Sequence, residues 1–503
     1  MYSPTLLLGQ LAVIAGATAA AQPSPVTIRA GGPDVSIAID NEIRYQAIDG
    51  FGFCEAFQRA HALINLPAPY RDEVIDLLFN PDTGAGFSIL RIGLGSSPNS
   101  TLDHMNSPQP SAHSPFVWDH NDSGQLWVAR QALRYGVRTF YADAWSAPGY
   151  MKTNGRDDQG GWLCGVRGEG VASTINGTTS ACGGASWVEA YAEYLVRYVQ
   201  SYLSEGIPIK FVGFLNEPNA IKGYATMQSD GYQAADEAFA LSLALRASNL
   251  SVGISCCEGQ GWSYARQLLS EMQDAGAEDT LSLITAHAYK GAPAAPDSPL
   301  NTTLPVWITE NSPIMQRLGM SQTWYNNGSE NEGLYWAVTI HNALTAGNVS
   351  AYIYWIGSEP YQVGGNFYVT DPPYQIGGNF WATSHFSRFI RPGATRIGTT
   401  TASTASKNDS SSVMVSAYEN KDGSVVVQVI NNCDQSVTAA VTAPNWVHTP
   451  TAWEACEVDT RMTDNTHNLT LADAIYLPAD GNLDTVFPPR SLTTLFVKCS
   501  GEN

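Results

Sequence analysis

The stretches KFVGFLNEP, residues 210–218, and LPVWITEN, residues 304–311, decide the fold that this chain is expected to adopt. Each begins with a run of apolar, β-branched and aromatic residues, as in a strand buried on both faces of a parallel sheet. A glutamate follows each run, Glu217 in the first stretch and Glu310 in the second. Carboxylates that follow buried strands are typical of the catalytic edge of an α/β barrel.

Six further segments rich in apolar, β-branched and aromatic residues complete a set of eight predicted strands. They span residues 47–52, 87–94, 137–144, 250–256, 282–289 and 349–356. Helical patterns lie between the strands, most clearly in residues 186–206, 232–249 and 335–348, where apolar residues recur at i, i+3 and i+4. The regular alternation of strands and helices predicts a closed (β/α)8 TIM barrel over residues 47–390 rather than an open sheet.

After residue 390 the pattern changes to short alternating strands separated by polar turns. Residues 411–419, 423–431 and 491–498 are the clearest examples, and they predict an all-β domain over residues 391–503. Residues 23–46 show the same alternation and are expected to add a strand. The sequence therefore predicts a side β-sandwich domain, formed mainly by the C-terminal segment plus an N-terminal strand.

The first 22 residues contain the apolar run LLLGQLAVIAGATAAA, which ends in small residues and predicts a secretory signal peptide over residues 1–22. No later apolar run has the length of about 18 residues that a membrane span needs. Eight cysteines, an even number, and repeated N-x-S/T sequons agree with a secreted, N-glycosylated protein. The sequons lie at Asn99, Asn121, Asn176, Asn249, Asn301, Asn327, Asn348, Asn408 and Asn468.

Cys164 and Cys182 enclose a Gly/Ser/Thr-rich stretch, so we expect a disulfide that staples this loop. The adjacent Cys256 and Cys257 are expected to be a buried pair of free thiols.

The formal net charge of −20 excludes nucleic acid and anionic membranes as natural partners, because the long-range field of the protein repels polyanions. A neutral polysaccharide fits this charge best. A substrate that carries acid groups requires a local Arg or Lys to offset the field. The chain is expected to act as a monomer.

Cleavage of a glycosidic bond needs one carboxylic acid to protonate the leaving oxygen and a second carboxylate to attack or to activate water. Glu217 and Glu310 follow predicted strands four and seven, which lie across a barrel from one another, so they supply such a pair. Asn216 is placed to hydrogen-bond a sugar 2-hydroxyl. Other predicted strand ends deliver candidates for sugar binding, namely Arg91, Trp145, His287, Tyr289 and Trp355.

Structural roles fit several of these residues as well. A single strand-end glutamate also suits a salt bridge or a helix N-cap, His287 also suits a buried structural position, and Trp145 and Trp355 also suit the core. The sequence has no HExxH motif, Asp-rich calcium loop or CxxC pair, so neither a metal nor a cofactor is predicted. It also lacks GxSxG and Gly-rich phosphate loops, which disfavours serine esterases and nucleotide enzymes.

Over nearly its whole length the chain resembles glycoside hydrolase family 30, a group of retaining barrel enzymes with a side β-sandwich. The matching segments are IDGFGFCEAFQRA (48–60), SILRIGLG (88–95), AWSAPGYMKTNG (144–155), NEP (216–218), WITEN (307–311) and FSRFIRPGATRIG (386–398). The resemblance implies that Glu217 is the acid/base and Glu310 the nucleophile. It also implies a sugar subsite lined by Arg91, Trp145, Asn216, Tyr289 and Trp355.

Within this family, GFCEAFQRAHAL (52–63) is most similar to the fungal xylan-acting branch, whose members cut glucuronoxylan internally or release xylobiose. An arginine of this loop recognises the methylglucuronic acid branch there, and Arg59 occupies that place. The expected function is hydrolysis of β-1,4-xylosidic bonds with retained configuration, with Glu217 protonated and Glu310 ionised. The alternatives are an endo-β-1,6-galactanase of the same family and a non-catalytic carbohydrate-binding wall protein.

Overall fold

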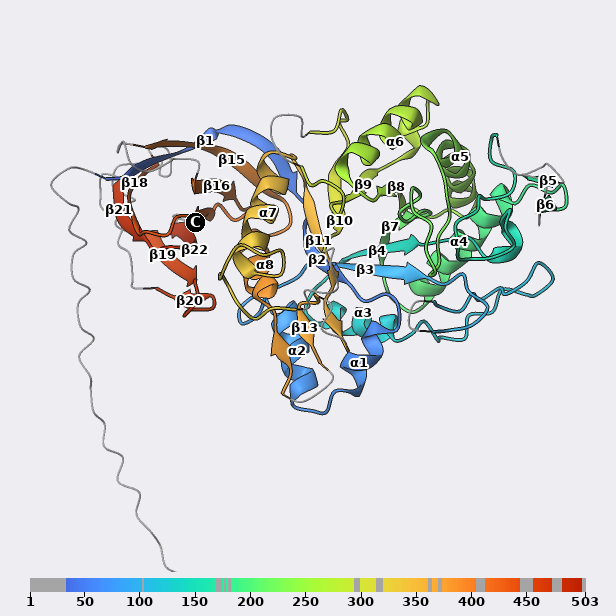
Figure 1. Cartoon of the computed structure of the whole chain (residues 1–503), viewed down its shortest axis with the longest axis horizontal. Coiled ribbons are helices and arrows are strands. Elements are labelled where there is room, and N and C mark those ends of the chain that lie inside the picture. Colours follow the sequence, from blue (N-terminus) through green and yellow to red (C-terminus); the bar gives the residue numbers. More distant parts are fainter. Residues whose placement is uncertain are drawn as a thin grey trace, which may run out of the picture.

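The computed structural model of the chain describes residues 33–499, apart from 102–103, 169–173, 176–177, 180–181, 294–298, 314–319, 361–363, 370–372, 404–411, 444–455 and 473–481 (Figure 1). The predicted signal peptide at residues 1–22 and the sequons at Asn176 and Asn408 lie outside the described residues.

Eight parallel strands form the closed barrel that the sequence predicts. Their order around the barrel is β10 (Val306–Glu310), β11 (Ala351–Ile356), β2 (Gly50–Cys54), β3 (Ile89–Leu94), β4 (Thr139–Ala144), β7 (Ile209–Gly213), β8 (Gly253–Gly259) and β9 (Leu283–His287). Almost every residue of these strands is buried, which explains why their sequences are continuously apolar rather than alternating.

Helices cover the outside of the barrel (Figure 1). They are α1 (Arg59–Asn65), α2 (Tyr70–Phe79), α3 (Gln125–Arg134), α4 (Val188–Ser204), α5 (Gly231–Ala247), α6 (Trp262–Asp274), α7 (Gly333–Thr345) and α8 (Gly378–Ser387). Helix α4 shows how sequence sets the packing, because Tyr191, Tyr194, Tyr198 and Tyr202 recur every three or four residues and are all buried. A small sheet of β12 (Ser358–Glu359), β13 (Phe367–Tyr368) and β14 (Gln375–Ile376) follows β11.

The C-terminal domain is a nine-stranded curled sheet beside the barrel (Figure 1). Its order is β20 (Thr470–Leu471), β19 (Cys456–Thr463), β22 (Ser491–Cys499), β17 (Val425–Asn431), β16 (Val413–Glu419), β15 (Ala394–Ser403), β1 (Val35–Ile48), β18 (Val437–Thr442) and β21 (Asn482–Phe487). The N-terminal strand β1 lies inside this sheet, between β15 and β18. The predicted fold class, a barrel with a side β-domain that includes an N-terminal strand, is therefore confirmed.

Strand β1 extends further than the sequence pattern indicates. Its last residues, Ala47 and Ile48, pair with Thr395 and Ala394 of β15. The first barrel strand begins only at Gly50. The predicted strand at residues 47–52 is thus divided between two sheets. Ala47 and Ile48 belong to the C-terminal sheet, and the residues from Gly50 belong to the barrel.

Cys164 and Cys182 form the predicted disulfide. The prediction for Cys256 and Cys257 is wrong, because these neighbours are joined by a disulfide instead of being free thiols. Among the described residues no helix is both long and apolar enough to cross a membrane.

Gly52 in β2 has no room for a side chain. A Cβ atom at this position would lie 2.0 Å from the carbonyl oxygen of Ile89 in the neighbouring strand β3. We predict that Gly52→Ala lowers the free energy of unfolding by roughly 2–4 kcal/mol, because the barrel backbone must shift to relieve the clash. Urea denaturation measures this change. Gly223→Ala is the control, since a Cβ there meets only the side-chain nitrogen of Gln159 at 3.7 Å, and equal stability of the two variants would contradict the prediction.

Candidate active site

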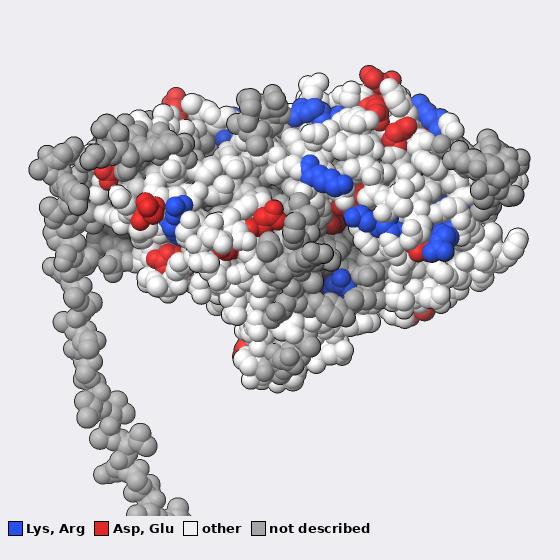
Figure 2. All heavy atoms as spheres, viewed as in Figure 1, with Lys and Arg blue, Asp and Glu red and all other residues white. Residues whose placement is uncertain are grey.

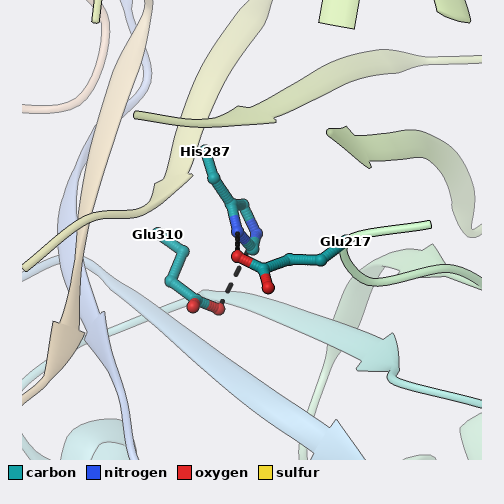
Figure 3. Close-up of side chains that lie close together, drawn as sticks. All are labelled: Glu217, His287 and Glu310. Atoms are coloured by element: carbon teal, nitrogen blue, oxygen red, sulfur yellow. Dashed lines mark hydrogen bonds and ion pairs between the residues drawn. The ribbon is translucent and has the colours of Figure 1, made fainter. Parts of the chain in front are cut away.

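Two glutamates from opposite strands face each other at the carboxyl end of the barrel (Figure 3). Glu310 is the last residue of β10, and Glu217 follows β7 by four residues. The backbone of Glu217 is left-handed, with φ of 48°, and its N–H donates to the carbonyl oxygen of Glu258. The exposed fractions of Glu217 and Glu310 are only 3% and 5%. One carboxylate oxygen of Glu217 lies within 4.8 Å of one of Glu310.

Arg91 of β3 is fully buried and connects several of the predicted site residues. Its guanidinium donates to Oε2 of Glu310, to Oδ2 of Asp143 at 2.7 Å and to Oδ1 of Asn216 at 2.6 Å. The same group lies 4.4 Å from the ring centroid of Trp145. Arg91 therefore fixes the positions of Glu310 and Asn216 relative to each other.

Glu310 also accepts a hydrogen bond on Oε1 from the hydroxyl of Tyr289, at 3.0 Å. Its surroundings are nevertheless unfavourable for charge. Burial, together with the negative charge of Glu217, raises the pKa of Glu310 and outweighs the nearby cations His287 and Arg91.

Glu217 has the opposite tendency. Its carboxylate accepts hydrogen bonds from Nδ1 of His287 at 3.2 Å and from Nε2 of Gln260 at 3.0 Å. Although burial opposes the shift, His287 and the charge of Lys222 lower the pKa of Glu217. The sequence analysis expects Glu217 to be protonated and Glu310 to be ionised. The pKa shifts of the two glutamates have the opposite directions, because His287 is a charged hydrogen-bond donor to Glu217.

A third carboxylate, Glu258 of β8, was missed by the sequence analysis. It is buried, and it accepts hydrogen bonds from the hydroxyls of Tyr141 and Thr309. Nε2 of His287 lies 2.7 Å from its Oε2. Although burial opposes the shift, Arg91 and His287 lower the pKa of Glu258 to about 2. The signal was present in sequence, because Glu258 follows the predicted strand at residues 250–256 by only two positions.

His287 lies at the centre of the three glutamates and is fully buried. Nδ1 faces Glu217, and Nε2 lies 2.7 Å from Glu258 and 3.7 Å from Glu310. Burial alone would lower its pKa, but these carboxylates raise the pKa of His287 to about 10. Glu217, His287 and Glu310 are close enough together to hold a metal ion. The raised pKa of His287 favours its imidazolium form, which has no lone pair to offer as a ligand and pairs with the carboxylates instead.

The carboxylate pair opens into a cavity of about 480 Å3. Its walls are formed by Phe57, Arg59, Trp145, Glu217, Lys222, Tyr224, Gln260, Tyr289, Lys290, Glu310, Ser312, Pro313 and Trp355. The rings of Trp145 and Trp355 lie 6.0 Å apart and tilted, which gives the cavity an aromatic wall suited to the apolar faces of sugars. Of the residues predicted from sequence, Arg91, Asn216 and His287 do not line the cavity but lie buried beneath it.

Arg59, Lys222 and Lys290 place three cations in the wall of this cavity. Figure 2 shows blue side chains around the hollow at the centre of the molecular face, on a protein whose net charge is −20. The guanidinium of Arg59 is held by a hydrogen bond of 3.2 Å to the carbonyl oxygen of Phe57. The cavity wall thus carries three cationic and two acidic side chains, whereas acidic residues predominate in the whole chain.

Comparison with known proteins gives two family matches and several similar structures that cover most of the chain. Residues 48–386 match the model of glycosyl hydrolase family 59, and residues 393–495 match the glycosyl hydrolase family 30 beta sandwich domain. The catalytic domain of the family 30 xylanase C from Talaromyces cellulolyticus is 36% identical, with a TM-score of 0.79 over 92% of this chain and 100% of that chain.

More distant similarities agree with this architecture. A family 30 subfamily 8 xylanase from Clostridium acetobutylicum is 22% identical, with a TM-score of 0.68 over 92% of this chain and 99% of that chain, and shares its fold. An endo-1,6-beta-D-glucanase from Trichoderma harzianum is 27% identical over 259 residues, 48% of this chain and 49% of that protein. The chain spans about half or less of the length of the curated relatives that it matches, namely 49% of this glucanase and 39% and 38% of two other fungal endo-1,6-beta-D-glucanases.

The role of Glu258 is testable through the charge of His287. We predict that Glu258→Gln lowers the pKa of His287 from about 10, because the substitution removes one of the carboxylates that stabilise the imidazolium. NMR of selectively labelled histidine measures the titration. Glu193→Gln, on the exposed face of α4, is the control. An unchanged His287 titration in Glu258→Gln would rule out this role.

The same shift sets a pH dependence of stability. The pKa of His287 in the folded protein is above the value of about 6.5 for an unfolded chain, so its stabilising contribution is complete below pH 6.5 and is lost as pH rises through about 10. Thermal unfolding across this window should show a smaller decline for Glu258→Gln than for the wild type.

Proposed function

Because the chain belongs to glycoside hydrolase family 30, with a barrel that also matches the family 59 model, we propose that it hydrolyses β-1,4-xylosidic bonds in xylan or glucuronoxylan. The observation that carries this proposal is the pair Glu217 and Glu310, which face each other at a single aromatic-lined cavity. The choice of xylan is supported by the 36% identity to a xylanase along 92% of the chain.

The reaction proceeds in two steps with retention of configuration. Glu217 donates its proton to the leaving glycosidic oxygen while a carboxylate oxygen of Glu310 attacks the anomeric carbon, which gives a glycosyl ester of Glu310. Water then attacks the same carbon, Glu217 takes its proton, and the ester bond to Glu310 breaks. Retaining enzymes hold their carboxyl groups about 5–5.5 Å apart and inverting enzymes about 6.5–9.5 Å. One oxygen of each carboxylate lies within 4.8 Å of the other, which is closer to the retaining than to the inverting separation and supports retention.

The charge network accounts for how one pair performs both steps. In the empty site burial raises the pKa of Glu310, whereas His287 lowers the pKa of Glu217. The first step therefore requires that substrate binding favour the proton on Glu217. Arg91 and Tyr289 supply the two hydrogen bonds that stabilise Glu310 once it becomes the anion. In the second step Glu310 is an ester, and His287 then favours ionised Glu217, which is the form that acts as a base.

The cavity wall supports a substrate that is neutral along its backbone and acidic at its branches. Trp145 and Trp355 provide faces for stacking of xylose rings. Arg59 contacts the carboxylate of a methylglucuronic acid branch, for which a guanidinium gives a charge-assisted, bidentate partner. Asn216 lies beneath the cavity with its Oδ1 held by Arg91, so we infer that its Nδ2 group is the part that reaches the sugar 2-hydroxyl. Chain cleavage is internal, releases xylobiose from chain ends, or both.

A second candidate substrate is a β-1,6-linked glycan. It is favoured by the 27% identity to an endo-1,6-beta-D-glucanase, and a β-1,6-galactanase is the alternative expected from sequence. A non-catalytic wall protein is disfavoured, because both carboxylates are retained at the cavity.

The remaining sequence-based assignments belong to the same proposal. The protein is exported through the signal peptide at residues 1–22, acts outside the cell as a monomer, and needs no cofactor. Its barrel and side domain divide after residue 390.

Replacement of the two glutamates tests the mechanism. We predict that Glu217→Gln lowers kcat/KM on glucuronoxylan by about 10²- to 10⁴-fold, through loss of proton transfer. Glu310→Gln should lower it on the order of 10³-fold or more, because no glycosyl ester forms. Release of reducing sugar measures both, with Glu193→Gln as the control. An activated 2-deoxy-2-fluoro-xylobioside should lose its leaving group to Glu310 attack and add the mass of the fluorinated xylobiosyl group to the peptide that contains Glu310. A first-formed product of inverted configuration would refute retention.

Replacement of Arg59 tests whether this residue binds the methylglucuronic acid branch. We predict that Arg59→Gln lowers kcat/KM on glucuronoxylan by about 10- to 100-fold, the usual effect of losing a charged hydrogen bond, and leaves turnover of neutral arabinoxylan unchanged. Product profiles on both xylans, β-1,6-galactan and β-1,6-glucan provide the measurement, with Arg71→Gln on the surface of α2 as the control. Faster turnover of a β-1,6-linked polymer than of either xylan would contradict the xylan assignment and identify the β-1,6-linked glycan as the substrate.

A further inference from the structure

A second cavity, of about 390 Å3, lies at the junction of the barrel and the β-sandwich domain. Helices α2 and α8 and the segment at β14 supply its barrel side, and the turn between β19 and β20 supplies its sandwich side. Its lining residues are Tyr70, Glu73, Gln322, Pro373, Tyr374, Ile376, Trp381 and Asn468. None of them lines the cavity of Glu217 and Glu310.

The chemistry of this second cavity is that of a sugar site. Tyr70, Tyr374 and Trp381 are each partly exposed, and the rings of Tyr70 and Tyr374 lie 6.4 Å apart at 75°. Glu73 and Gln322 add hydrogen-bonding groups at the rim. Aromatic faces combined with a few polar groups bind pyranose rings by stacking and directed hydrogen bonds.

Asn468 contributes a point of covalent attachment to the same cavity. It is the acceptor asparagine of the sequon Asn468-Leu469-Thr470, and both Asn468 and Thr470 are exposed. The turn that carries it is held against the barrel, because Asn465 and Tyr325 exchange hydrogen bonds of 2.7 and 2.8 Å. The side chain of Asn468 is therefore kept in the wall of the cavity.

We propose that Asn468 carries an N-linked glycan whose first sugars pack into this cavity against Tyr70, Tyr374 and Trp381. The glycan is bonded to the sandwich domain at Asn468 and packs without a covalent bond against the barrel. It forms when the side-chain nitrogen of Asn468 loses a proton and bonds to the anomeric carbon of N-acetylglucosamine, which leaves a lipid-linked diphosphate donor. This inference rests on the proposed export of the protein and not on its substrate.

Native deglycosylation tests the proposal on the full chain secreted from a eukaryotic host. Glycopeptide mass spectrometry should find Asn468 occupied. A peptide N-glycosidase applied to the folded protein should release this glycan at least tenfold more slowly than the glycan of Asn327, an exposed sequon outside the cavity. Trp381→Ala and Tyr70→Ala should each bring the release rate at Asn468 close to that at Asn327. An unoccupied Asn468, or equal rates in the wild type, would overturn the proposal.

Removal of the sequon gives a second readout. Thr470→Val keeps Asn468 but abolishes its glycosylation, and it should lower Tm by about 1–2 °C or more while leaving xylan turnover unchanged. Ser329→Ala, which removes the Asn327 sequon, is the matched control and should leave Tm unchanged. Binding of free xylo-oligosaccharide to the second cavity of the wild type would also contradict the proposal, because it would identify a different occupant.

Discussion

The buried guanidinium of Arg91 is the interaction on which the rest of the site depends. It joins β3 to residues at the ends of three other barrel strands, through Asp143, Asn216 and Glu310. A charge that has lost all contact with water is tolerated only when it is paired and hydrogen-bonded, so the carboxylates around Arg91 are as necessary to it as it is to them. The same ion pairs and hydrogen bonds of Arg91 therefore position the catalytic side chains and link the barrel strands.

His287 is the second buried cation of the site. Three glutamates converge within the barrel mouth, and their mutual repulsion would keep most of them neutral without a second buried cation. With both ring nitrogens engaged, His287 lets Glu217 and Glu258 be anionic while Glu310 remains the group that burial disfavours as an anion. Two chemically identical side chains thereby acquire different proton affinities from their surroundings alone. The order in the empty site favours ionised Glu217, which is the form needed for the second step, so the first step requires the bound substrate to reverse it.

The sequence predicted most of the fold and the placement of Glu217 and Glu310, because buried parallel strands are continuously apolar and end at polar residues. It did not separate β1 from β2, since Ala47 and Ile48 are equally apolar in either sheet. It also reversed the proton affinities of Glu217 and Glu310, because these depend on which atoms meet around His287, and that is a property of tertiary structure. Glu258 was overlooked because it lies two residues past the apolar pattern at residues 250–256, whereas β8 continues to Gly259.

The position of β1 has a consequence for synthesis of the chain. This strand is near the N-terminus, yet it lies between β15 and β18, with Val35 opposite both Ser403 and Ala439. Its hydrogen-bonding partners are made only after the whole barrel, so during translation β1 has two unsatisfied edges for most of the time that the ribosome needs to complete the protein. Strand β1 is therefore made early and is among the last strands to reach its native neighbours.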